Sequence, residues 1–251
     1  MAFSFRHLIR HAFVVTALLI AGSGLRAQPV SLPPATFQLY APAPLGDLFY
    51  DLKGRPVSIH VGHQSFSAAA VVPPGGNVVL YRFKPAAEPG LPPVREPVLS
   101  AAVTAREGAQ TLLLIYPEGP PPPDGTPDTR PLRSLVFDQS AGGFPHGTIR
   151  VFSFSARPVA MKIGPAAVPV PSMQTVIVPY PDDRRTWLHI ATIGEQGWQR
   201  VIGTPQTLGP RTRLSLFLRD IPPSQYDPKP IGLLLGKILE TIPETAEAPR
   251  S

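Results

Sequence analysis

The segment Arg55-Pro56-Val57-Ser58-Ile59-His60-Val61-Gly62 returns further along the chain as Arg157-Pro158-Val159-Ala160-Met161-Lys162-Ile163-Gly164. The shift from position 55 to position 157 is 102 residues. Both segments begin with Arg-Pro-Val, keep an apolar residue at every second position and end in glycine. Such alternation is typical of a β-strand with one buried face. The recurrence predicts two copies of one β-rich unit.

Two further apolar segments follow the same shift. It places Asp47–Leu52 on Ile149–Phe154, and Thr111–Tyr116 on Arg213–Leu218. Three segments in one register indicate two domains of about 100 residues each, a size that suits a small β-sandwich.

Short apolar runs bordered by proline and glycine predict an all-β chain. Proline falls mostly at the borders of the runs, as in Pro73-Pro74-Gly75-Gly76 and Pro222-Pro223. Prolines in such places are typical of turns and sheet edges, and closely spaced short strands indicate a sandwich or a barrel. The predicted strands are 37–40, 48–52, 57–61, 66–72, 78–83, 98–104, 110–116, 135–138, 148–154, 159–163, 168–170, 175–178, 187–193, 198–203 and 212–219.

The alternation also predicts which side chains are buried. Val57, Ile59 and Val61 share one face of their strand. In the second copy Val159, Met161 and Ile163 take the inward positions, and Lys162 takes an outward one. The same face is therefore expected to be buried in both copies. Other runs, such as Leu112–Ile115, are apolar at consecutive positions.

Residues 1–27 have the pattern of a secretory signal peptide. Arg6 and Arg10 precede an apolar run over residues 12–21, and Ala27 offers a small residue for cleavage. The run is shorter than the roughly 20 residues that a membrane-spanning helix needs, although an uncleaved N-terminal anchor is the alternative. We expect an exported chain that starts near Gln28, in the periplasm or at the cell surface.

Composition excludes several function classes. The chain has no cysteine, so thiol catalysis, disulfides and cysteine zinc sites are excluded. Loss of Arg6, Arg10 and Arg26 with the leader leaves 20 basic against 17 acidic residues, a charge of +3. A charge this small gives no electrostatic footprint for nucleic acid.

The expected domain layout follows from the repeat and from a proline-rich segment. Residues 28–117 form the first predicted sandwich domain and residues 134–223 the second. Between them, residues 118–133 contain four consecutive prolines and are predicted to form a semi-rigid linker or a long surface loop.

Residues 224–251 are predicted to form a C-terminal helix and tail. Ile231, Leu234, Leu235 and Ile238 have the spacing of one helical stripe, and Pro230 precedes them where a helix can start. Such a helix would either dock on the second sandwich or serve as a hydrophobic handle for a partner or a membrane surface.

No catalytic or metal-binding constellation stands out. The histidines beyond the leader are His60, His63, His146 and His189. His60 and His63 are three residues apart across a strand and a turn, a spacing that points two strand residues to opposite faces, and a metal site needs three or four converging ligands. Ordinary surface histidines are expected.

Ser65 and Ser67 lie in a strand–turn–strand context, whereas a nucleophile elbow needs strand–turn–helix. The chain thus carries no predicted catalytic, cofactor-binding or metal-ligating residue, and no cofactor is expected.

Two surface features remain as candidates for binding. Asp182-Asp183-Arg184-Arg185 either binds a cation or polyanion or forms a charged solvent loop. Trp187 and Trp198 lie in a predicted hairpin whose turn is Gly194-Glu195-Gln196-Gly197, with Tyr180 beside it. The two tryptophans would form an aromatic platform for a sugar or would pack in the core.

The run Phe144-Pro145-His146-Gly147-Thr148-Ile149-Arg150-Val151-Phe152, followed by Arg157-Pro158-Val159, resembles a strand–turn–strand motif of uncharacterised exported bacterial proteins with tandem Ig-like β-sandwiches. The layout, with Leu39-Tyr40-Ala41-Pro42 near the start, is also distantly similar to periplasmic accessory proteins of alginate acetylation. That resemblance implies two Ig-like antiparallel sandwiches in an adaptor without catalysis of its own. Its motifs encode strands and turns, so it assigns no functional residue.

The sequence therefore favours an exported, non-catalytic protein that acts by binding, as an adaptor or structural component of the cell envelope. Its expected partner is another envelope protein or a polysaccharide, and self-association through sheet edges is a further possibility. The alternative is a carbohydrate-binding protein or a carbohydrate-active enzyme.

Overall fold

The computed structural model describes residues 32–119, 130–181 and 185–241, and within these ranges the fold is all-β without a helix. Each predicted apolar run overlaps an observed strand. The strands of the first half are β1 Thr36–Tyr40, β2 Gly46–Leu52, β3 Arg55–Val61, β4 Ala70–Val71, β5 Asn77–Lys84, β6 Val94–Ala102, β7 Gln110–Pro117 and β8 Leu132–Asp138. Those of the second half are β9 Thr148–Ser153, β10 Val159–Ile163, β11 Ala166–Val170, β12 Thr175–Pro179, β13 Arg185–Gly194, β14 Gly197–Thr207, β15 Thr212–Asp220 and β16 Leu233–Thr241.

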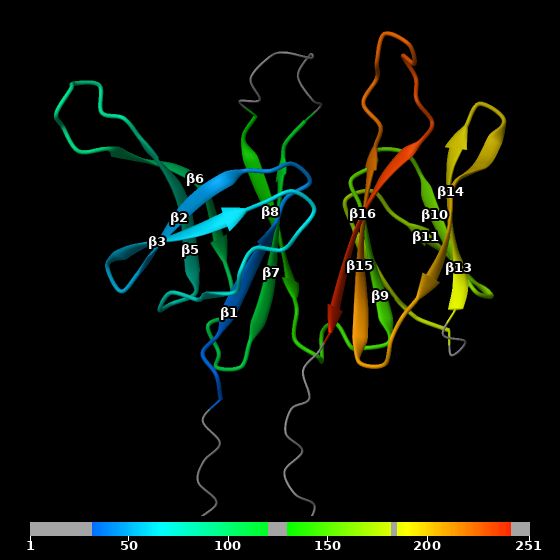
Figure 1. The fold of residues 1–251 in the computed structure, drawn as a ribbon, viewed down its shortest axis with the longest axis horizontal. Coiled ribbons are helices and arrows are strands. Elements are labelled where there is room, and N and C mark those ends of the chain that lie inside the picture. The colour runs from blue at the N-terminus through cyan, green and yellow to red at the C-terminus, as the bar shows by residue number, and fades with distance from the viewer. Residues whose placement is uncertain (1–31, 120–129, 182–184, 242–251) are drawn as a thin grey trace, which may run out of the picture. The chain divides into compact units, whose positions relative to one another are not determined.

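The strands form four sheets, two in each half (Figure 1). The first half has an outer sheet of order β3-β2-β5-β6 and an inner sheet of order β4-β1-β7-β8. The second half has an inner sheet of order β12-β9-β15-β16 and an outer sheet of order β11-β10-β13-β14. Adding eight to each strand number of the first half gives the orders of the second half, so the internal repeat is present in the topology.

The predicted 102-residue register of the repeat is wrong in detail. It places β3 on β10 and β2 on β9, whereas the sheet orders match β3 with β11 and β2 with β10. It does place β7 on β15, but Leu113 of the first core then falls on Ser215, outside the second core. Because a one-residue slip exchanges the faces of a strand, apolar alternation alone did not fix the register.

Each half has its own core between its two sheets. Leu39 on β1 and Leu48 on β2 are fully buried in the first, and Val151 on β9 and Ile190 on β13 in the second. The predicted inward faces are confirmed: Val159, Met161 and Ile163 are all buried, while Lys162 between them is exposed.

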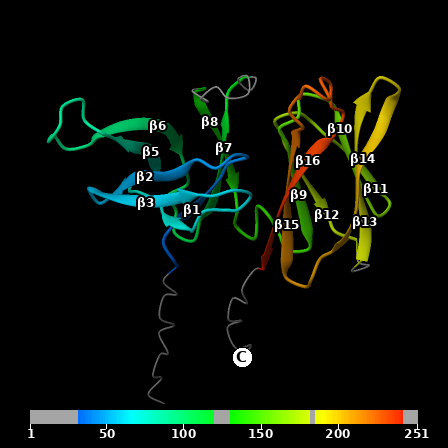
Figure 2. The same cartoon turned by 45° about the horizontal axis from the view of Figure 1, so that its top comes forward.

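A third apolar cluster lies between the two inner sheets. Tyr40 on β1 stacks on Phe217 of β15, with ring centroids 3.7 Å apart and ring planes 14° apart. Leu112 and Leu114 on β7 and Phe152 on β9 complete its buried part. Figures 1 and 2 both draw β7 and β8 on the side of the first half that faces β15 and β16. The two sandwiches therefore share a packed layer.

The third core explains the strands with consecutive apolar residues. Residues 111–115 of β7 and 212–218 of β15 are buried at every position. A strand alternates only when one of its faces meets solvent, and both faces of the inner sheets are covered.

The predicted wholly antiparallel arrangement is wrong at two pairs. β1 pairs in parallel with β7, and β9 in parallel with β15. Parallel pairing is typical of sheets covered on both faces, as these inner sheets are. The strand order also departs from that of an immunoglobulin constant domain, in which the first strand pairs with the second.

The predicted C-terminal helix is wrong, because Leu233–Thr241 forms β16, paired antiparallel with β15. Leu235 packs against the second core and Ile238 against the third. A strand that is apolar on both faces gives the same residue spacing as a helical stripe, so periodicity could not separate the two.

The predicted domain boundaries also need to move. β8 pairs with β7, so the first half extends to Asp138, and β16 belongs to the second half. The proline-rich segment connects two strands of one sheet and does not join the halves. The predicted leader, most of that segment and Asp182–Arg184 lie outside the described residues.

The third core generates a first prediction. Truncating Phe217 removes the ring under Tyr40 and leaves a cavity between the halves. We expect Phe217→Ala to lower the free energy of unfolding by about 3–5 kcal/mol in urea denaturation. Phe83→Ala, at a phenylalanine that is 38% exposed on β5, is the matched control and should cost much less. Equal losses would show that packing between the halves contributes no more to the free energy of unfolding than a partly exposed ring on the surface does.

The same layer predicts a pH dependence. Burial raises the pKa of Tyr40 from 10.0 to about 12, and the charge of Arg219 opposes the rise only in part. Because the folded pKa lies above the unfolded one, this contribution to stability is fully present below pH 10 and is lost as the pH rises to about 12. Burial also raises the pKa of Tyr50 and Tyr81.

We therefore expect the free energy of unfolding to fall between pH 10 and about 12, and to fall less steeply in Tyr40→Phe, which keeps the ring stack. Urea unfolding at stepped pH measures both profiles. Superimposable profiles for the two proteins would contradict the assignment to Tyr40.

Candidate functional site

The layer between the halves changes character along β15. The odd-numbered residues of this strand face the first half: Arg213 at one end, Ser215 and Phe217 in the middle, and Arg219 at the other end. Two distinct regions result, a buried polar cluster at the Arg213 end and an open groove at the Arg219 end.

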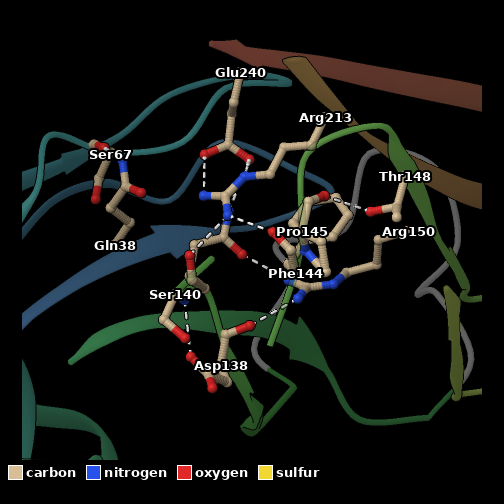
Figure 3. Close-up of polar contacts among 11 residues, drawn as sticks. Gln38, Ser67, Asp138, Ser140, Phe144, Pro145, Thr148, Arg150, Arg213 and Glu240 are labelled. Atoms are coloured by element: carbon tan, nitrogen blue, oxygen red, sulfur yellow. Dashed lines mark hydrogen bonds and ion pairs between the residues drawn. The ribbon is translucent and has the colours of Figure 1, made fainter. Parts of the chain in front are cut away.

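Arg213 is the centre of the polar cluster (Figure 3). Its guanidinium donates hydrogen bonds to the backbone oxygens of Gln139 and Phe144, each at 2.9 Å. It also forms an ion pair with Glu240 of β16, with a nitrogen–oxygen distance of 3.1 Å. The Arg213 side chain is only 6% exposed, so these partners satisfy a charge that water does not reach.

Arg150 on β9 forms the other side of the cluster. It donates to the side-chain oxygen of Gln139 at 2.6 Å and to the backbone oxygen of Asp138 at 2.7 Å. The Phe144 ring lies between the two arginines, with its centroid 4.0 Å from the Arg150 guanidinium carbon and 4.9 Å from that of Arg213. Cation–π contacts of this kind add stability when the cation is desolvated.

The cluster fixes the connection between the halves. Asp138 ends β8 and Thr148 begins β9, so the chain crosses from one sandwich to the other here. A Cβ at Gly143 in this connection would overlap the Asp138 side chain, which is why only glycine fits. Gln139 also donates to Glu240 at 2.8 Å. We call Gln139, Phe144, Arg150, Arg213 and Glu240 the crossover cluster.

Electrostatics indicate a structural role for the crossover cluster. Burial, and after it the neighbouring charge of Arg213, lower the pKa of Arg150 to about 10, against the opposing charges of Glu240 and Asp138. Burial raises the pKa of Asp138, but hydrogen bonds from Ser140 and the charge of Arg150 outweigh it and leave this pKa below its usual value. At neutral pH Arg150 stays charged, and its two terminal nitrogens are engaged by Gln139 and Asp138, whereas its buried Nε has no partner.

At the other end of β15 a groove opens between the halves. Its volume is about 1640 Å³, and both halves line it, with Pro42 and Tyr116 from the first and Phe154 and Ile231 from the second. Arg219 spans it by donating a hydrogen bond to the backbone oxygen of Pro42 at 3.1 Å.

The groove is lined by apolar and charged side chains together. Among the described residues that line it, the cations outnumber the carboxylates: they are Arg130, Arg133, Arg157, Arg219 and Lys229, against Glu118, Glu195 and Asp220. Two of the carboxylates are engaged, Glu118 by Arg133 at 2.8 Å and Asp220 by Arg157 at 2.6 Å. The groove therefore presents a positively charged, proline-rich wall.

The residues weighed in the sequence analysis do not converge. His60 pairs with Asp47 at the surface, at 2.7 Å. The Ser67 hydroxyl accepts a hydrogen bond from the Leu39 N–H and donates to the Ala68 oxygen, so it is engaged by the backbone. The described part of the chain holds no group of three or more His, Asp or Glu side chains placed to bind a metal ion.

The two tryptophans lie on the predicted hairpin, which is present as β13 and β14. Trp187 is 57% exposed and Trp198 is 55% exposed, so neither packs in the core. Tyr180 is half-buried against the second core.

Sequence reasoning missed the crossover cluster and the groove. Arg150 and Arg213 lie inside strands that were predicted for their apolar residues. An arginine within a strand that is otherwise apolar on both faces was a readable signal of a buried, hydrogen-bonded charge. The groove had no such signal, because it depends on how the two halves pack.

No helix long and apolar enough to cross a membrane occurs in residues 32–119, 130–181 or 185–241. No protein-family model matches the sequence, and no curated protein is significantly similar to it.

The crossover cluster generates a prediction. Replacing Arg213 removes the ion pair with Glu240 and leaves two backbone oxygens without their donor. We expect Arg213→Met to lower the free energy of unfolding by about 3–5 kcal/mol, measured by urea denaturation. Arg133→Met removes the exposed pair with Glu118 and should cause a far smaller loss. If the two variants are equally stable, the cluster does not fix the crossover.

Proposed function

We propose that this protein is an exported, non-catalytic two-sandwich protein that acts by binding, and that its partner docks in the groove between the halves. The observation that carries the proposal is the groove of about 1640 Å³ lined by both halves. Sites for small molecules usually measure roughly 300–1,000 Å³, so this groove suits an extended chain better.

The lining favours a segment of another envelope protein as the occupant. Exposed apolar side chains such as Ile231, 43% exposed, offer contact area, while Arg219 and Lys229 offer positive charge. Prolines at the rim, including Pro42 and Pro117, restrict the backbone and lower the entropy lost on binding. A segment that alternates apolar and acidic residues would match this wall.

The architecture supports an adaptor because the groove exists only while the halves stay packed. A relationship of each half to the immunoglobulin fold remains a prediction. The features in common with that fold are the β2–β5 pairing in the first half and the β10–β13 pairing in the second.

Site-specific photocross-linking in the native cell envelope tests the proposal. A photoreactive phenylalanine analogue at Ile231, inside the groove, should give one discrete adduct with another protein. The same analogue at Leu91, which is 57% exposed in the connection between β5 and β6, is the control and should not give that adduct. An adduct equally strong at both positions, or only with a second copy of this chain, would overturn the proposal.

Charge reversal gives the matching prediction. Lys229→Glu places a carboxylate in the groove at a position without structural contacts to the cores. We expect it to reduce the adduct at Ile231 by roughly tenfold or more, with unchanged thermal stability. Lys53→Glu, in the exposed turn between β2 and β3, should leave the adduct as it is.

A further inference from the structure

The outer sheet of the second half presents an outward face, and the groove reaches it only near the β13–β14 turn, at Ile193. β13 alternates strictly, with Leu188 and Ile190 buried in the second core and Trp187, His189 and Ile193 pointing outward. This outward face belongs to a sheet of order β11-β10-β13-β14, whose other face covers the core. The outward side chains are therefore not needed for packing between sheets.

Both tryptophans of the chain lie on this face. The Trp187 ring stacks parallel to His189, with centroids 6.0 Å apart and planes 7° apart. Trp198 pairs across the hairpin with Ile193, about six residues or roughly 20 Å along the strand from Trp187. More than half of each indole is exposed, which is a large apolar surface to leave in water without a ligand.

A hollow of about 520 Å³ lies beside Trp187 and is lined by His189, Arg200 and Gly203 among others. Gly203 pairs with His189 in the sheet, and a Cβ at Gly203 would stand 3.5 Å from the His189 Nδ1 atom and 3.9 Å from the Arg200 Cδ atom. Gly203 is not among the glycines with positive φ, so its backbone would accept another residue. The missing side chain leaves the hollow open.

The charge on this face is of one sign. The four strands of the sheet contain no Asp or Glu. Lys162 pairs with His189 in register, Arg200 pairs with Ala191, and Arg185 lies two residues before Trp187 on the same face. Three cations thus surround the two tryptophans without a carboxylate on the same sheet.

The corresponding sheet of the first half shows the contrast. There three basic side chains each pair with an acid: His60 with Asp47, Arg95 with Asp51, and Lys84 with Glu96. Arg82 on β5 instead donates to the backbone oxygen of Leu45. The repeat therefore carries two versions of one surface: the sheet of the first half contains acids that pair with several of its basic side chains, and the strands of the second contain basic side chains without acids.

These features select an acidic polysaccharide among polyanions. Flat exposed indoles stack on sugar rings, and separated cations meet carboxylates spaced along a chain. A duplex-type phosphate contact would engage about 6–10 cations, and polybasic lipid-binding segments carry about 4–8. The three cations lie among two indoles. They therefore fit a polymer whose negative charges are fewer and are separated by flat sugar rings.

We propose that the outer face of the β11-β10-β13-β14 sheet binds an acidic polysaccharide. One sugar ring stacks on Trp187 over the hollow beside Gly203, another stacks on Trp198, and carboxylates meet Arg200 and Lys162. The hollow beside Trp187 shares no lining residue with the groove between the halves. Binding of a polysaccharide here therefore goes beyond the proposed docking of a protein segment.

Tryptophan fluorescence gives a direct test, because both tryptophans of the chain are at the site. The purified protein is titrated with polygalacturonate, with neutral dextran and with single-stranded oligothymidylate. We expect polygalacturonate to shift and quench the emission saturably, dextran to have a far weaker effect, and added salt to weaken binding. Trp187→Ala and Trp198→Ala each leave one reporter and should weaken binding roughly two- to tenfold.

Gly203→Val fills the hollow and should weaken binding while retaining thermal stability, and Arg200→Gln should weaken binding and reduce its salt dependence. Phe83→Ala on the outer sheet of the first half is the control and should bind as the unaltered protein does.

The proposal is overturned if polygalacturonate leaves the emission unchanged, if dextran binds equally well, or if oligothymidylate binds more tightly through the same residues. Lys229→Glu, which tests the groove, should leave the titration unaltered. Failure at one site is thereby distinguished from failure at the other.

Discussion

The packing of one inner sheet on the other is the constraint on which the rest of the structure depends. Tyr40 lies flat on Phe217, and Gly236 on the neighbouring strand leaves room for it, since a Cβ at Gly236 would stand 3.0 Å from the Tyr40 hydroxyl oxygen. A ring stack of this kind forms only if β1, β15 and β16 keep their mutual registers. The third core therefore joins two sandwiches, each with a complete core of its own, into one packed unit, and burial of apolar surface is its driving force.

Both ends of this layer follow from that packing. At the Arg213 end the layer is closed, because the crossover cluster engages two buried guanidinium groups through backbone oxygens, an amide and a carboxylate, and leaves only the Arg150 Nε without a partner. At the Arg219 end the sheets diverge from each other and leave a groove with walls from both halves. One face of β15 contributes Arg213, Phe217 and Arg219 in turn. Arg213 lies at the closed end of the layer between the halves, Phe217 in its packed middle and Arg219 at the groove.

The sequence predicted much of this fold and little of how its parts meet. Alternation at Val159, Met161 and Ile163 identified a strand and its buried face correctly, because one face of that strand meets solvent. The strands at Leu112–Ile115 and Leu233–Thr241 are apolar on both faces, and for these the pattern carried no information on register and imitated a helix in the second case. β8 pairs with the strand before it, β7, but the proline-rich segment between them gave no signal of that pairing. The tryptophans were recognised as a possible platform, whereas the glycine-floored hollow beside Trp187 required the sheet register.

Hydrogen exchange followed by mass spectrometry tests the central claim, that the two sandwiches are stabilised as one unit through the layer between them. Amides of β7 and of β15 are compared in the unaltered protein and in Phe217→Ala, a substitution confined to the second half. The account predicts that the most protected amides of both strands exchange with similar opening free energies, and that the substitution lowers protection in both. Loss of protection in β15 with unchanged protection in β7 would contradict it, because the first sandwich would then be stable without the second.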